Sequence, residues 1–112
     1  MSRPATFEEF WPSYLRAHCS RRSRAFHVTG TALAFVCLAL FLITFHLGWI
    51  VAAAVAAYGL AWAGHLIFEQ NVPATFSHPL WSLRGDLRMV WLTLTGRIEA
   101  EAARVGCPQN DG

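Results

Sequence analysis

Charged residues are scarce in this sequence, and lysine is absent. Only 14% of the 112 residues are charged, whereas 54% are hydrophobic. About a quarter of the residues are charged in a typical soluble domain. No Asp, Glu, Lys or Arg occurs from position 25 to position 68. This composition is a poor match to an ordinary soluble domain and favours a membrane protein with one domain, covering about residues 1–106.

Basic residues are also missing from the middle of the chain. All nine are arginines, and none lies between Arg24 and Arg84. Nucleic-acid binding requires a basic surface, so this distribution predicts no nucleic-acid partner. Arginines that flank the apolar segments instead indicate membrane topology. The positive-inside rule predicts that both termini are cytoplasmic and that His46 lies on the opposite side.

The three cysteines show no spacing typical of a metal site. They are Cys19, Cys37 and Cys107, and Cys37 lies inside an apolar run. An odd number of cysteines without a recognisable framework predicts three reduced thiols and no disulfide.

Two long apolar runs dominate what remains, at residues 28–47 and 49–68. Each is about the 20 residues that a helix needs to cross a hydrocarbon core. We therefore expect transmembrane helices at about residues 27–46 and 49–69, joined by a tight turn around Leu47 and Gly48. Such a short turn makes the helices antiparallel neighbours. A buried hairpin in a soluble protein is the alternative.

Amphipathic segments flank the hairpin on both sides. Thr6 and Glu9 form a capping box before an aromatic face, which predicts a helix over about residues 7–18; Pro12 indicates a kink or a later start. A second helical pattern covers about residues 79–104, after an irregular stretch at Asn71–Ala74 and His78–Pro79. We expect a disordered tail at residues 107–112. The predicted fold is all-α: an integral membrane helical hairpin with flanking interfacial amphipathic helices.

Folding the hairpin brings ionisable residues to one level. His27 lies about 20 positions before the turn, and His65 and Glu69 lie about 17 to 21 positions after it. His65 and Glu69 share a helical face because they are four residues apart. His18 reaches this level from the first helix. Several imidazoles with one carboxylate suit Fe(II), Zn(II) or Mn(II).

Each of these residues also has a structural interpretation. His18 could cap an amphipathic face, and His27 could bond to backbone at a helix start. Glu69 could reach the interface and pair with Arg24 or Arg84. His46 is interpreted as an interface residue, and His78 lies in a loop before a proline.

Four sequence motifs resemble those of a known family. They are Tyr14-Leu-Arg-Ala-His18, Arg24-Ala-Phe-His27-Val-Thr-Gly30-Thr31, Gly64-His65-Leu-Ile-Phe-Glu69-Gln-Asn71-Val-Pro73-Ala74 and Pro79-Leu-Trp-Ser-Leu83. Over about residues 7 to 98 the chain resembles small membrane 2-hydroxy fatty acid dioxygenases, long catalogued as a domain of unknown function.

The resemblance implies an Fe(II)-dependent dioxygenase that converts a 2-hydroxy fatty acid, with molecular oxygen, to the acid one carbon shorter. It implies His18, His27 and His65 as iron-site residues and Glu69 as a carboxylate that binds the iron or supports a ligand. Arg24 and Arg84 are candidates to hold the substrate carboxylate. Two alternatives remain open: a membrane metal- or haem-binding protein without lipid turnover, and a scaffold protein. The sequence leaves oligomer formation open.

Overall fold

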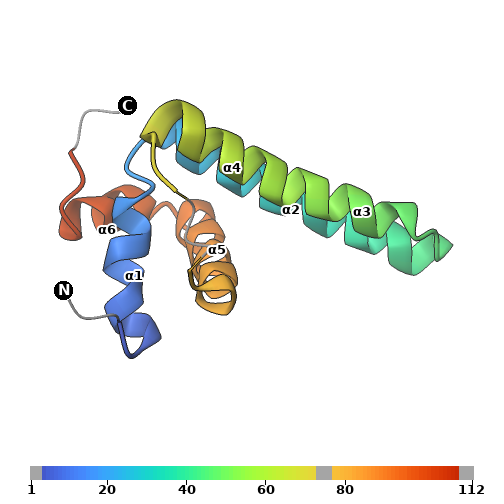
Figure 1. Ribbon diagram of the computed structural model, residues 1–112, viewed down its shortest axis with the longest axis horizontal. Helices are drawn as coiled ribbons and strands as arrows, with labels where there is room; N and C mark the ends of the chain where they lie inside the picture. The colour runs from blue at the N-terminus through green and yellow to red at the C-terminus, as the bar shows by residue number, and fades with distance from the viewer. Residues whose placement is uncertain (1–3, 73–76, 109–112) are drawn as a thin grey trace.

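The computed structural model describes residues 4–72 and 77–108, and within them it contains helices and no strands. The helices are α1 (Phe7–Arg16), α2 (Arg21–Thr44), α3 (Gly48–Ala54), η1 (Val55–Gly59), α4 (Leu60–Gly64), η2 (His65–Glu69), α5 (Pro79–Leu94) and α6 (Ile98–Arg104). The segments from α3 to η2 form one continuous rod in which η1 and η2 are π-helical. Figure 1 shows α2 and this rod as a long hairpin that projects from α1, α5 and α6.

The hairpin confirms the predicted all-α membrane fold. Both of its arms, Arg21–Thr44 and Gly48–Glu69, are long and apolar enough to cross a membrane. Only 11% and 22% of their most apolar windows are buried inside the structure, whereas the core helix of a soluble protein would be mostly buried. The turn between the arms places Phe45 in the left-handed region, at φ 55°.

The helix boundaries differ from expectation at three places. The first helix ends at Arg16 and contains Pro12 within it. The second begins at Arg21, because the Ser20 side chain accepts hydrogen bonds from the backbone of Arg22 and Ser23 and so caps the helix. The predicted helix over residues 79–104 is two helices, separated at Gly96, whose φ of +73° interrupts the helical backbone.

Cys19 and Cys107 form a disulfide across 88 residues of sequence. The prediction of three reduced thiols was therefore wrong, since only Cys37 is free among the described cysteines. The pairing depends on tertiary structure, because the end of α6 folds back onto the connection between α1 and α2 and no local spacing encodes that contact. Cys107 is buried, whereas residues 109–112 of the expected disordered tail lie outside the described residues, as do positions 73 and 74 of the expected irregular stretch.

A small core lies beside the base of the hairpin. The aromatic face of α1, predicted to lie in the membrane interface, is instead covered by α5, α6 and the segment after α6; the buried residues of this core are Phe7, Phe10, Trp11, Tyr14, Leu15, Met89, Ile98, Ala102, Val105 and Cys107. Gly85 on α5 permits this packing, because a Cβ atom there would lie 3.1 Å from the Tyr14 ring. The core fixes α1 and α5 against the site described next.

Candidate metal centre

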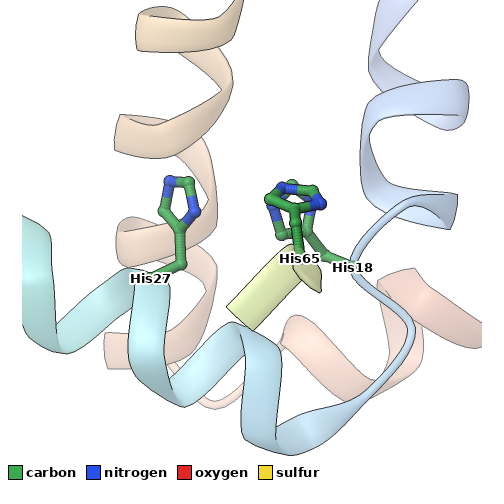
Figure 2. A group of neighbouring side chains, drawn as sticks. All are labelled: His18, His27 and His65. Atoms are coloured by element: carbon green, nitrogen blue, oxygen red, sulfur yellow. The ribbon is translucent and has the colours of Figure 1, made fainter. Parts of the chain in front are cut away.

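Three histidines from three segments meet at the base of the hairpin. His18 comes from the connection between α1 and α2, His27 from the second turn of α2, and His65 from the start of η2. Their potential ligand atoms all lie within 4.8 Å of one another. Figure 2 shows the rings of His18 and His65 overlapping in the view, with the ring of His27 to one side. The three residues are 1%, 6% and 2% exposed, respectively, so the cluster is closed to bulk solvent. The structure therefore brings together the three histidines expected from the sequence.

One ring nitrogen of each histidine is held by an acceptor. His18 Nδ1 donates to the Tyr14 carbonyl at 2.9 Å, and His65 Nδ1 donates to Asn71 Oδ1 at 2.5 Å. His27 Nε2 donates to Asp86 Oδ1, also at 2.5 Å. Such bonds select the tautomer and the ring orientation, and metal-bound histidines almost always make them.

The opposite nitrogens are the ones that could bind a metal. His18 Nε2 and His27 Nδ1 are buried and have no hydrogen-bond partner. Buried polar atoms without a partner are rare, since leaving one unsatisfied costs about 1–3 kcal/mol. Because Nδ1 of His65 is held by Asn71, Nε2 is the nitrogen of His65 that remains to bind a metal. The residues present thus fit a divalent metal ion held by three neutral imidazoles.

Burial also keeps His18 neutral. Desolvation holds its pKa well below the ordinary value, and the neighbouring His27 and His65 lower that pKa further. A neutral imidazole has a free lone pair and is the form that binds metals. The electrostatics of His18 therefore agree with a role as ligand.

Asp86 was missed as a site residue in the sequence. Its Oδ1 accepts hydrogen bonds from the Tyr14 hydroxyl and from His27 Nε2. Burial and the nearby Asp86 carboxylate raise the pKa of Tyr14 well above its usual value, so Tyr14 stays a proton donor to Asp86. A signal was present, because Asp86 lies between Leu83 and Val90 on the apolar side of its helix, where a carboxylate is out of place.

Asn71 was also missed, and the end of η2 explains its position. Gln70 adopts a left-handed conformation at φ 56°, and the Asn71 backbone N–H returns to the His65 carbonyl. This reversal directs the Asn71 amide onto the ring of His65, and its Nδ2 donates to the Ala17 carbonyl next to His18. Asn71 therefore links two of the three histidines.

Glu69 does not join the histidine group. Its Oε2 accepts hydrogen bonds from the Ser20 backbone N–H at 2.7 Å and from the Ser23 hydroxyl. Both donors lie at the start of α2, where a carboxylate is favoured by the unpaired N–H groups and the helix dipole. The structure thus places Glu69 as a support between η2 and α2.

The two candidate arginines contact backbone carbonyls, a carboxylate and an aromatic ring. The buried guanidinium of Arg24 donates to the carbonyls of His18 and Cys19 and pairs with Glu99 at 2.8 Å. Arg84 lies over the Phe7 ring, 4.2 Å from its centroid. Arg24 therefore holds the segment that carries His18, and Arg84 packs on α1.

The two remaining histidines are separate from the cluster. His78 stacks on Trp81 with 5.5 Å between ring centroids. His46 is exposed at the far end of the hairpin, as predicted. Neither belongs to the group of residues whose ligand atoms converge.

Comparison with known proteins gives one result. Residues 4–98 match the model of a family described as "2-hydroxy-palmitic acid dioxygenase Mpo1-like". No curated protein and no solved structure matches the chain. The family match covers all three histidines together with Asp86, Asn71 and Tyr14.

Proposed function

The chain belongs to the Mpo1-like family, and on that premise we propose that it is an Fe(II)-dependent dioxygenase acting on 2-hydroxy fatty acids. The reaction would release the carboxyl carbon as carbon dioxide and leave the acid one carbon shorter, with molecular oxygen as oxidant and water as the other product. The observation that carries this proposal is the buried group of three histidines, two of which have an unpartnered ring nitrogen.

His18, His27 and His65 would hold the iron. When bound, the iron would supply the redox chemistry and a coordination site for the hydroxyl and carboxylate oxygens of the substrate. Three protein ligands would leave coordination positions for a chelating substrate and for oxygen. No arginine is then needed to hold the substrate carboxylate.

The supporting residues would fix the three ligands before the substrate arrives. Asp86, itself held by Tyr14, fixes the His27 tautomer, and Asn71 does the same for His65. Arg24 and Glu69 would act one step further out, by fixing the segment from His18 to Ser23. We propose positioning roles for Asp86, Asn71, Arg24 and Glu69. Their hydrogen bonds go to the three histidines or to the segment that carries His18.

The membrane would bring the substrate to this site. The base of the hairpin carries the arginines, so we propose that the site lies at the cytoplasmic interface with both termini on that side. A reporter protein fused after residue 110 tests this topology: reporter activity on the outer side of the membrane would contradict it.

The function is tested by incubating purified, iron-loaded protein with 2-hydroxy-palmitic acid in detergent or lipid. We expect oxygen-dependent formation of pentadecanoic acid, and loss of that product when a ferrous chelator is added. A haem carrier would instead show a strong haem absorption band and form no product. Iron-loaded, folded protein that never shortens the acid would contradict the proposal.

A further inference from the structure

A cavity of about 230 Å³ adjoins His27, one of the three clustered histidines. His27 and Asp86 line its polar end, and the other lining residues come from α2, from the returning arm of the hairpin and from α5. The cavity is therefore continuous with a ligand histidine and with the carboxylate that holds it.

The walls of the cavity follow the hairpin away from the site. On α2 the lining passes from His27 through Thr31 to Leu38, a distance of about 16 Å by helical rise. The facing wall is built from alanines at helical spacing: Ala53, Ala57 and Ala61. Small side chains on one wall leave room between arms that otherwise pack closely. The lining is mostly apolar, with its charged group at one end and the hydroxyl-bearing side chains of Thr31 and Tyr58 farther along.

One side of the cavity opens toward the surroundings of the hairpin. Leu83 and Leu87 of α5 form this rim, and they are 52% and 45% exposed. Both belong to a row of exposed apolar residues on α5, namely Leu80, Leu83, Leu87, Trp91 and Leu94. Because an exposed apolar row beside a membrane hairpin faces lipid, an occupant can enter sideways from the bilayer.

We propose that this cavity holds the alkyl chain of a single-chain lipid acid and that its far end, at Leu38 and Ala54, sets the chain length. The inference rests on the proposed function and adds to it a substrate-chain site with named length-determining residues. The alkyl chain already lies in an apolar medium in the bilayer, so moving it into the cavity gains little from the hydrophobic effect. Length selection therefore comes from steric fit against the residues that line the cavity.

Phenylalanine substitutions at two depths test the fit. Ala54 lines the far part and Ala57 the middle, and neither is fully buried. We expect Ala54→Phe to lower kcat/KM for the longest 2-hydroxy acids at least tenfold while short acids stay within about twofold. Ala57→Phe should move the cut-off to still shorter acids, and Leu38→Ala should move it to longer ones. The substrates run from 2-hydroxyoctanoic to 2-hydroxydocosanoic acid.

Ala39→Phe is the matched control. Ala39 lies on α2, the helix that carries Leu38; it is exposed, lies outside the cavity lining and receives the same added volume. Its length profile should equal that of the wild type, with equal iron content and melting temperature in all four variants. Equal profiles for Ala54→Phe, Ala57→Phe and wild type, at full iron loading, would overturn the proposal.

A binding measurement separates this inference from the proposed function. A 2-hydroxy acid with a diazirine at its methyl end should crosslink to the segments around Leu38 and Ala54, and excess 2-hydroxy-palmitic acid should compete. Specific crosslinking there without turnover would support the chain site and contradict the dioxygenase function. Turnover with competed crosslinks only on other segments would support the function and overturn the chain site.

Discussion

The two ends of the hairpin differ in which side chains they bury and which they expose. At the base, residues 21–30 and 60–69, polar side chains such as Ser23, Arg24, His27 and His65 are buried. At the tip, residues 40–52, large apolar side chains are exposed, with Ile43 and Phe45 each at 75%. Polar groups inside and apolar groups outside are the pattern of a membrane protein with a built polar site.

The comparison explains which histidines can have a function. His27 and His65 lie at the base, where a carboxylate and an amide select their tautomers. His46 lies at the tip, exposed and remote from both. What distinguishes a ligand from an interface histidine is therefore the partner on its second nitrogen, and sequence position alone does not show that partner.

Among the changes to supporting residues, removing the charge of Asp86 should impair metal binding and turnover most. Asp86→Asn keeps the shape but removes the carboxylate that orients His27, so we expect metal affinity and turnover to fall about 10- to 100-fold. Glu69→Gln is the comparison variant and should lose less, because its carboxylate bonds to Ser20 and Ser23 and not directly to a histidine. Isothermal titration with Fe(II) and turnover at matched iron loading measure both. A loss as large in Glu69→Gln would show that charge at the base, rather than the bond to His27, is what matters.

Helical rise explains why the hairpin and two of its histidines could be predicted from the sequence. Helical rise alone determines that His27 and His65, about equally far from the turn, reach the same level. Asp86 and Asn71 could not be placed this way, because their contacts depend on how α5 packs and on the backbone reversal at Gln70. Cys19 and Cys107 were misread for the same reason, since tertiary packing brings their segments together.

Close packing at the base should be sensitive to one methyl group. A Cβ atom on Gly30 would lie 2.6 Å from the Ala56 carbonyl oxygen, whereas one on Gly59 would meet nothing within 4 Å. We expect Gly30→Ala to destabilise the hairpin by about 1–3 kcal/mol through overpacking. Gly59→Ala should be neutral or stabilising by up to about 1 kcal/mol, since alanine favours helix. Melting temperatures in one detergent give the comparison, and equal loss in both variants would exclude close approach as the cause.

The core beside the base should add a small acid-sensitive contribution. The pKa of Glu101 is lowered to about 2, first by its hydrogen bond with Arg104 and then by that with Trp11. A lowered pKa in the folded state means that the stabilisation is present above the unfolded value of 4.5 and is lost as pH falls toward 2. Glu101→Gln should therefore lower stability at neutral pH by less than about 1 kcal/mol and flatten the stability profile in that window. The free energy of unfolding of wild type and Glu101→Gln, measured from pH 6 to pH 2, would show this difference. The same pH dependence in both proteins would contradict it.

The most direct test of the central claim is iron stoichiometry in anaerobically loaded protein. Wild type and His46→Ala should each bind about one Fe(II) per chain, as expected for one site built from three histidines. His18→Ala, His27→Ala and His65→Ala should each lose stoichiometric binding while their far-ultraviolet circular dichroism stays helical. Full iron in folded His27→Ala and His65→Ala would contradict a metal centre at the base of the hairpin.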